Sequence, residues 1–229
     1  RIMWKSLRSM FYVLGLIKED KSLVRENVEE VTNNFSEIVK MNRTDFMKFL
    51  ANTIQGELNV KSFYNDRSYE YPTYEKYFKN SFLLNMSRDG IETIDEIISI
   101  KDTPVISMVW QPERIKDCYI SICEKCNRSF DIHEAENNVK GILVEPLGIV
   151  LVYQGNHSVN SAIIHNEGEI HVKEKVDITS VLQKYRFDGM GYVSLDSGKY
   201  INCKDMLDGY RPLTHTMGVL YETVRKSIL

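Results

Sequence analysis

The spacing of hydrophobic residues changes from helical to strand-like along the chain. From about residue 20 to 41, apolar residues recur every three or four positions, with Glu, Lys and Asn between them: Val24, Val28, Val31, Phe35 and Ile38. An apolar stripe of this period predicts an amphipathic helix that packs one side against a core.

A second helix is predicted from about Thr44, whose hydroxyl suits an N-cap, to Gly56. The residues on its apolar side are Phe46, Phe49, Leu50 and Ile54. Residues 1–17 place basic residues before an apolar stretch, which faintly resembles a secretion signal, but the pattern continues into charged helix and predicts a helix instead. The tyrosine-rich stretch interrupted by Pro72 predicts a connection and a short helix. We therefore expect residues 1–99 to form a helical N-terminal section.

After residue 100 the pattern predicts strands alternating with helices. The strand-like runs are "TPVISMVW", "KGILVEPL", "GIVLVY" and "GEIHVKEKVDI", and helices are predicted from Pro112, after Gly155 and near Ser180. A last helix carries one apolar face, made of Met217, Leu220, Tyr221, Val224 and Ile228. The sequence predicts an α+β fold: the helical section packs on a small mixed β-sheet, and residues 100–229 form the α+β core with its C-terminal helix, in one compact unit.

Composition narrows the classes of function. The chain has 229 residues, with 29 basic and 32 acidic side chains and a formal charge of −3, so no global positive field draws it to nucleic acid. It has no apolar run of membrane-spanning length, and we expect no membrane partner. Four cysteines are too few for a secreted disulfide framework and favour a cytoplasmic location. Because the first residue is Arg1 rather than Met, the natural N-terminus is expected upstream.

The stretch "LVYQGNHSVNSAII", residues 151–164, crowds Gly155, Asn156, His157 and Ser158 into a strand-to-helix turn. A glycine there permits close backbone approach, and the N–H groups that begin a helix form an anion site. His157 could act as an acid or a base, while Asn156, Ser158 and Asn160 could donate hydrogen bonds. The alternative is that Asn156 or Ser158 only caps the helix and His157 is a satisfied buried histidine.

Two resemblances bear on this turn. The run "GIVLVYQGNHSVNSAI" resembles the box of ParB-type and sulfiredoxin-type domains, in which a strand delivers a glycine-containing turn to the head of a helix. A broader and closer resemblance covers about residues 100–200, through "DTPVISMVWQPERI", "NNVKGILVEPLGIVLVYQGNHSVNSAI" and "VDITSVLQKYRFDGMGY". It is to an uncharacterised family of bacterial proteins associated with phage and mobile elements.

The ParB and sulfiredoxin resemblance implies a ParB/sulfiredoxin-like sheet and binding of nucleotide phosphates at Gly155–Ser158. Asn156 stands where sulfiredoxin has its catalytic cysteine, so the resemblance does not extend to sulfiredoxin activity. Ser158 stands where an arginine usually grips phosphate, and Arg114, at the start of the preceding helix, is the candidate to replace it. The resemblance thus implies that the protein binds a nucleotide, with Mg²⁺ as a candidate cofactor. It leaves hydrolysis of a nucleotide or phosphodiester as an open extension.

Two further groups of residues are candidates for chemistry. Glu145, at the end of a strand, is a candidate general base or metal ligand if that strand end faces the turn; otherwise it is a surface carboxylate. Cys118, Cys123, Cys126 and His133 offer ligands for zinc, but the second close pair of a zinc ribbon is missing and we predict no metal site there.

The sequence therefore predicts a protein that binds a nucleotide or a nucleic-acid phosphate at residues 155–158, with hydrolysis as an open extension. Phage defence or mobile-element biology is the setting that the resemblance implies. The rival hypothesis is a non-catalytic protein-interaction or structural protein whose turn is only a helix cap.

Overall fold

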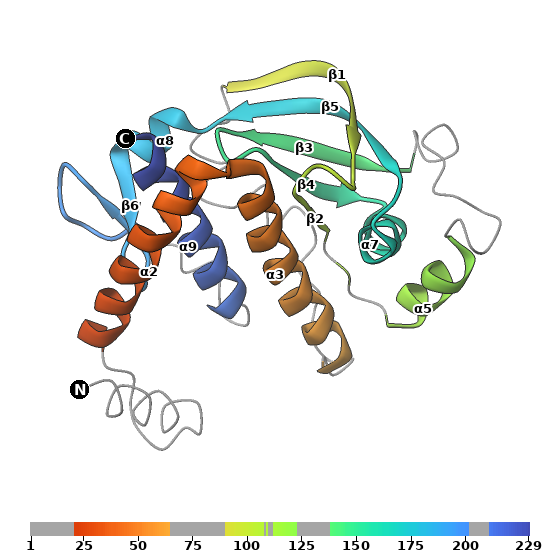
Figure 1. Ribbon diagram of the computed structural model, residues 1–229, viewed down its shortest axis with the longest axis horizontal. Coiled ribbons are helices and arrows are strands. Elements are labelled where there is room, and N and C mark those ends of the chain that lie inside the picture. The colour runs from red at the N-terminus through yellow and green to blue at the C-terminus, as the bar shows by residue number, and fades with distance from the viewer. Residues whose placement is uncertain (1–20, 65–89, 108, 110–111, 123–137, 202–210) are drawn as a thin grey trace.

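The computed structural model describes residues 21–64, 90–107, 109, 112–122, 138–201 and 211–229 (Figure 1). The helix expected within residues 1–17 and the tyrosine-rich stretch that includes Pro72 lie outside these residues. The fold is mixed α/β, as predicted. Its helices are α2 (Lys21–Met41), α3 (Arg43–Tyr64), α5 (Pro112–Ser121), α7 (Asn156–His165), α8 (Thr179–Lys184) and α9 (Arg211–Ile228). Its strands are β1 (Ile91–Ser99), β2 (Val105–Ser107), β3 (Lys140–Glu145), β4 (Ile149–Gln154), β5 (Glu169–Asp177), β6 (Tyr185–Phe187) and β7 (Tyr192–Ser194).

The main sheet is mixed and has five strands in the order β1-β5-β3-β4-β2. β3 and β4 form an antiparallel hairpin, whereas β2 runs parallel to β4 and β3 runs parallel to β5. The carboxyl ends of β2 and β4 therefore meet at the same edge of the sheet. Since α5 follows β2 and α7 follows β4, the beginnings of these two helices lie at that edge.

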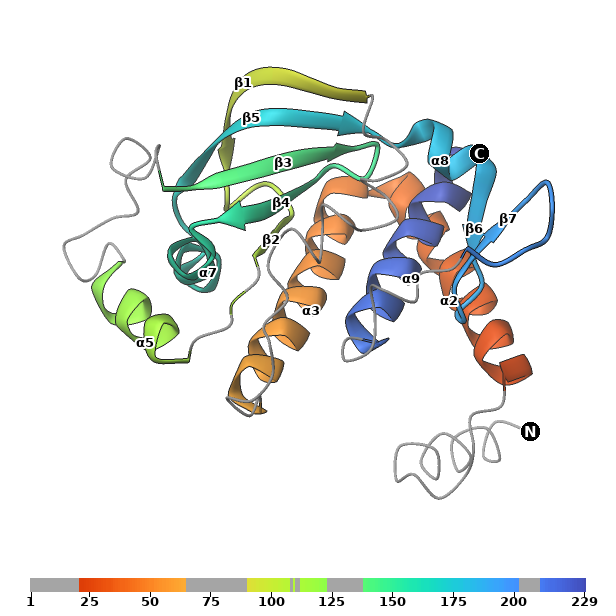
Figure 2. The same ribbon diagram turned by 180° about the vertical axis from the view of Figure 1, so that it is seen from behind.

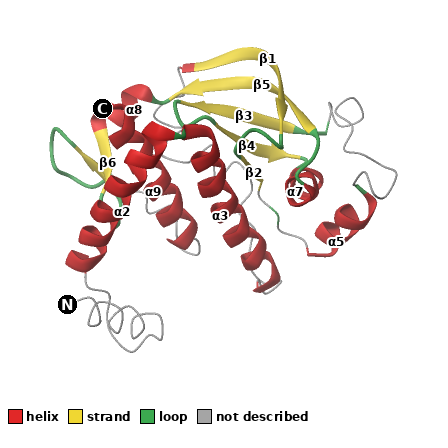
Figure 3. Ribbon diagram, viewed as in Figure 1, coloured by secondary structure: helices red, strands yellow, loops and turns green. Residues whose placement is uncertain are grey.

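Helices cover both faces of the sheet. In Figures 1 and 2, α2, α9 and α3 run side by side below the sheet, whereas α7 and α5 lie on the opposite side of the view from α2. Figure 3 separates the helical layer in red from the strands in yellow. Alternate strand residues divide between two cores, so that Ile142 and Leu151 face the α2, α3 and α9 layer while Leu143 and Val150 face the side that holds α7. No helix among the described residues is long and apolar enough to span a membrane.

Helix α2 is confirmed, but its buried face is rotated from the predicted stripe. Val31 and Ile38 are 37% and 40% exposed, whereas Thr32 and Ser36 are buried where α2 packs on its neighbours. Thr32 Oγ1 donates to Val28 O at 2.7 Å, and Ser36 Oγ donates to Asn33 O at 2.7 Å. Because each hydroxyl is satisfied by its own helix, both can be buried at little cost and still allow close packing.

Helix α3 extends well beyond the predicted limits. The side chain of Asn42, not Thr44, caps it, since Asn42 Oδ1 accepts from the backbone N of Asp45 at 3.4 Å. Gly56 does not end the helix, which runs on to Tyr64. A Cβ at Gly56 would meet nothing within 4 Å, so this glycine lies on an open side and only lowers helix propensity. The prediction of a stop at Gly56 was wrong, and the extra turns include Asn59, which bonds to Gln55 just before Gly56.

Strand β1 was not predicted. It falls within the segment expected to be helical, and its pairing with β5 starts the main sheet before residue 100. Its pattern "IETIDEIIS" is mostly exposed, with Ile97 61% exposed and Ile98 buried. An edge strand with only one covered face has few apolar positions, so its sequence alone resembles an amphipathic segment of either kind.

A second, two-stranded sheet of β6 and β7 packs beside α2. Asp188 forms the turn between the two strands, because Asp188 Oδ1 accepts from the backbone N of Met190 at 2.9 Å. The other carboxylate oxygen of Asp188 accepts from Arg25 Nε on α2 at 2.9 Å and also contacts the Tyr200 hydroxyl. These hydrogen bonds keep the pKa of Asp188 below its usual value in spite of its burial, so the turn anchors α2 with a charged group.

Candidate functional site

The Gly155–Ser158 turn lies where three segments meet. Gly155 adopts φ 77° and ψ 20° and precedes the first residue of α7. A Cβ at this position would lie 2.6 Å from Asn138 O and 2.7 Å from Val139 Cγ2, in the segment that leads into β3. Glycine is therefore required twice, for its left-handed backbone and for the close approach of another chain segment. Gly155 is also the N-cap residue of α7 and, having no side chain, supplies no capping hydrogen bond.

Helix α5 lies against α7 through a line of polar contacts. Ser161 Oγ lies 3.1 Å from Cys118 O and 3.2 Å from Ile122 O, so this hydroxyl satisfies carbonyls in the last turn of α5. Cys118 Sγ lies 4.0 Å from Ser158 Oγ. Tyr119 stacks on His165 at the other end of α7, so the second half of α5 packs along α7. Cys118 lies next to Ser158 in the first turn of α7, and the start of α5 is about one turn before Cys118.

Arg114 occupies this start of α5, four residues before Cys118 and on the same side of the helix. Its positive charge is the second of the two causes that lower the pKa of His157. The structure therefore places Arg114 on α5, one helical turn before the residue that contacts Ser158.

His157 is 5% exposed and carries a shifted pKa. Burial, with a smaller contribution from the Arg114 charge, lowers the pKa of His157 from 6.5 to about 4. The imidazole is therefore neutral at physiological pH, with one nitrogen able to donate and the other able to accept. A bound anion would oppose both causes and raise this pKa.

The shift makes stability depend on pH. A histidine with a pKa near 6.5 in the unfolded chain and about 4 in the fold binds more protons when unfolded, so stability falls as the pH drops from 6.5 to 4. We expect wild type to lose at most about 3 kcal/mol of unfolding free energy in this window through His157, and His157→Gln to lack that component. Urea denaturation at pH 7, 5.5 and 4 measures it; identical pH profiles for both proteins would contradict the shift.

Asn160, one turn into α7, ends a chain of side-chain amides. Gln55 Oε1 accepts from the backbone N of Ser107 at 2.7 Å, and Gln55 Nε2 donates to Ser107 O at 3.0 Å. Gln55 Nε2 also donates to Asn59 Oδ1 at 3.0 Å, and Asn160 Nδ2 donates to the same oxygen at 2.8 Å. Gln55, Ser107 and Asn160 are at most 2% exposed, so this amide chain links α3, β2 and α7 in the interior.

Asn156 and Ser158 differ in environment. Asn156 is 2% exposed, whereas Ser158 is half-buried and faces α5 through its contact with Cys118. Asn156 and Asn160 are four residues apart and share a side of α7. The candidate site is therefore made of the start of α7, Arg114 from α5 and the buried Asn160 one turn behind.

Glu145 is not part of this site. It ends β3 at the hairpin, whereas the start of β3, Lys140, pairs with Gln154 next to the turn. The two ends of β3 are five residue steps apart along the strand, a distance of roughly 16 Å. The condition under which Glu145 was a candidate base or metal ligand is not met, because antiparallel pairing carries it to the opposite edge from His157.

Metal ligands do not gather among the described residues. No group of three His, Cys, Asp or Glu side chains there is arranged to hold a metal ion. Of the four residues considered for zinc, Cys118 is described and is a free, half-buried thiol, whereas Cys123, Cys126 and His133 lie outside the described residues. Mg²⁺ binding with a nucleotide therefore stays a prediction, and so does the expectation that the cysteines hold no zinc.

Sequence reasoning missed Gln55, Asn59 and Ser107. A weak sign was present, since Gln55 and Asn59 are four residues apart and interrupt the apolar side of a helix that was expected to stop at Gly56. Ser107 interrupts the apolar run of β2 in the same way. A buried polar residue within an apolar stretch requires a partner, but only the fold shows which one.

Comparisons with known proteins give a family and no activity. No curated protein matches the chain, and no solved structure matches it. A family model described as "Family of unknown function (DUF6710)" matches residues 17–228, which spans both the helical layer and the sheet. The chain therefore belongs to the DUF6710 family.

Proposed function

We propose that this protein binds a phosphate group of a nucleotide or nucleic acid at the Gly155–Ser158 turn. The observation that supports the proposal is the packing of α5, which carries Arg114, against the first turn of α7, where Cys118 contacts Ser158 and the N-cap residue Gly155 has no side chain. Helix N-termini favour anions through their N–H groups and their dipole, and a guanidinium adds a charged, two-pronged donor. The ParB/sulfiredoxin-like resemblance, which puts nucleotide phosphates at this turn, agrees in position.

His157 has a defined part in the proposed site. A phosphate at the turn lies near the neutral imidazole in our proposal. The negative charge then favours protonation of His157, so binding takes up a proton and becomes tighter as the pH falls from 7 towards 5. Such a site suits binding more than hydrolysis, because its base is weak before the anion arrives.

Replacement of Arg114 by methionine tests the site. We expect isothermal titration with inorganic phosphate and AMP, with and without Mg²⁺, to give a dissociation constant roughly ten to a hundred times larger for Arg114→Met than for wild type, the size of a lost charge-assisted hydrogen bond. Lys116→Met is the matched control, since Lys116 is also exposed on α5 but points to the other side of the helix.

Two results would remove the proposal. One is the absence of heat and of thermal stabilisation with either ligand in wild type, since a ligand that binds only the folded state must raise the melting temperature. The other is an equal loss of affinity in Arg114→Met and Lys116→Met, which would indicate only a general charge effect. Turnover of AMP or of a phosphodiester in the same samples would extend the proposal to hydrolysis.

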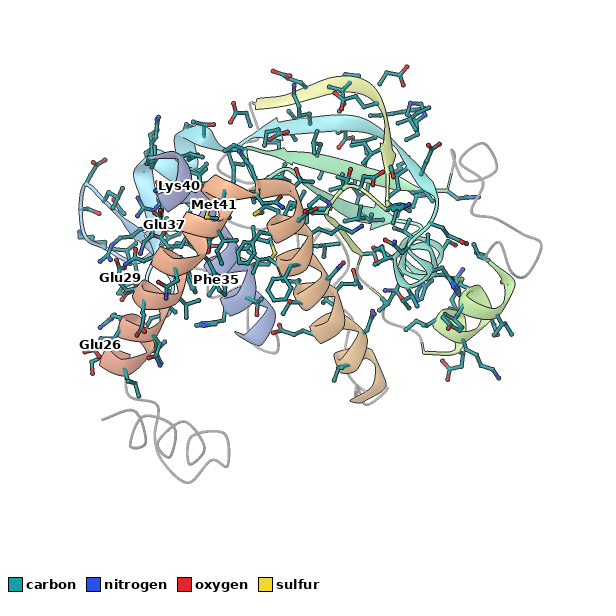
Figure 4. All side chains as sticks on the ribbon, viewed as in Figure 1. Glu26, Glu29, Phe35, Glu37, Lys40 and Met41 are labelled. Carbon is teal, nitrogen blue, oxygen red and sulfur yellow. The ribbon has the colours of Figure 1, made fainter. Side chains whose placement is uncertain are left out.

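A protein-interaction role is the second candidate, and one surface favours it. Phe35 on α2 points towards α3 (Figure 4), where its ring meets Phe46 at 5.0 Å, and Phe46 stacks on Phe49 at 5.7 Å. Phe49 is 56% exposed at the end of this line. Phe49→Ser would weaken a complex formed through this surface while leaving phosphate binding unchanged. The phage or mobile-element setting, suggested by the resemblance, is compatible with both functions.

A further inference from the structure

The orientation of the Asn160 side-chain amide is determined by a series of hydrogen bonds that begins at the backbone of β2. Ser107 N–H can only donate and Ser107 O can only accept, so the Gln55 amide must place Oε1 on the first and Nε2 on the second. The remaining hydrogen of Gln55 Nε2 then requires an oxygen from Asn59. This oxygen in turn requires the Nδ2 group of Asn160. Each side-chain amide therefore has a single orientation that makes all of these hydrogen bonds, and Asn160 Oδ1 takes part in none of them.

This last oxygen has no partner. Asn160 is 0% exposed, and its Oδ1 meets no hydrogen-bond donor among the described residues. A buried acceptor without a donor costs about 1–3 kcal/mol, so an unsatisfied one needs an explanation. Asn160 lies on the side of α7 that it shares with Asn156, four residues and about 6 Å along the helix from the turn. The unpaired acceptor therefore belongs to a residue one helical turn from the proposed phosphate position.

We propose that Asn160 determines specificity, and that its Oδ1 accepts a hydrogen bond from a sugar hydroxyl of a ligand whose phosphate lies at the Gly155–Ser158 turn. The inference rests on the proposed function and narrows it to a nucleoside phosphate. Inorganic phosphate cannot supply a donor about 6 Å from its own position at the helix start, whereas a ribose hydroxyl lies a few bonds from the phosphate. Gln55 and Asn59 are positioning residues, because their hydrogen bonds fix the orientation of the Asn160 amide.

The test compares two ligands that differ only in this donor. AMP and 2′,3′-dideoxy-AMP share the base and the phosphate, so the ratio of their dissociation constants isolates the sugar hydroxyls. In wild type we expect AMP to bind at least about tenfold more tightly, the usual effect of leaving a buried acceptor unpaired. Asn160→Leu keeps the branched skeleton of the side chain without the acceptor, and we expect its ratio to fall to about one while inorganic phosphate affinity changes less than about twofold.

Asn59→Leu tests the positioning role. This variant leaves the Gln55 hydrogen bonds to Ser107 in place but frees the Asn160 amide to turn. The ratio of the dissociation constants of 2′,3′-dideoxy-AMP and AMP should therefore fall part of the way towards the ratio expected for Asn160→Leu. Asn52→Leu, on the exposed side of the same helix, is the control and should keep the wild-type ratio.

The outcomes separate this inference from the proposed function. In one outcome, wild type binds inorganic phosphate and binds AMP and 2′,3′-dideoxy-AMP equally tightly. This result overturns the inference alone, because it would mean that a buried water satisfies Asn160 with every ligand. Equal loss of inorganic phosphate and AMP in Asn160→Leu also overturns it, because Asn160 would then only support the fold. No binding of either ligand to wild type removes the proposed function and the inference with it.

Discussion

Gly155→Ala is expected to lower the free energy of unfolding by about 3 kcal/mol, through backbone strain and a steric clash together. The added Cβ would lie 2.6 Å from Asn138 O, which is backbone and cannot move aside as a flexible side chain can. Relief of the clash requires separating the turn from the segment before β3. Because the same movement displaces the start of α7, phosphate binding should be lost with the stability.

Gly148→Ala is the matched control for this prediction. Gly148 also has a positive φ, of 66°, but a Cβ there would meet nothing within 4 Å. Its replacement should cost only the backbone strain, about 1 kcal/mol, and leave phosphate binding intact. Urea denaturation of both variants at pH 7 gives the comparison. Equal losses in the two would mean that the close approach at Gly155 carries no energy and that the turn tolerates a side chain.

The parts of the fold that depend on local pattern could be predicted from the sequence. The β3–β4 hairpin follows from two apolar runs separated by a Pro–Gly turn, and α7 follows from the change of period after Gly155. These elements bury most of their apolar residues in the two cores, so their pattern and their burial agree. The location of the candidate site at a strand-to-helix turn depends on the same local features.

The parts that depend on distant packing could not be predicted. β1 is a half-exposed edge strand with only a weak apolar pattern, and Gly56 lies inside a helix that tertiary packing carries on to Tyr64. The place of Glu145 was left open in the sequence prediction, although the hairpin that the pattern indicates already carries the end of β3 away from the end of β4. Arg114 was a candidate without a known position until the parallel pairing of β2 and β4 brought α5 and α7 together.

The amide chain shows the same limit at the level of side chains. Gln55 lies 52 residues before Ser107, and Asn59 lies 101 residues before Asn160, so no local pattern connects them. Gln55 also occupies the hydrogen-bonding groups of Ser107 in β2, which is an edge strand of the main sheet. An unpaired edge is a risk for aggregation, and a side-chain amide that satisfies both backbone groups closes it.

Gln55→Leu is therefore expected to cost about 2–4 kcal/mol of unfolding free energy. The variant leaves the buried N–H and C=O of Ser107 without partners, in a residue that is 0% exposed. Leucine is close to glutamine in size, so the loss reports the hydrogen bonds more than the packing. Urea denaturation measures the loss, and light scattering should show a raised tendency to associate through the opened edge of β2.

Asn160→Leu is the informative partner of this variant, because it removes the other end of the same chain. Asn59 Oδ1 would keep the hydrogen bond from Gln55, so no buried group becomes newly unpaired, and the unsatisfied acceptor itself disappears. We expect Asn160→Leu to be as stable as wild type or up to about 1 kcal/mol more stable. A residue whose removal stabilises the fold is kept for some other reason, which is what a ligand-binding role requires. A loss as large as that of Gln55→Leu would instead make Asn160 a structural part of the core, and the acceptor would need a buried water rather than a ligand.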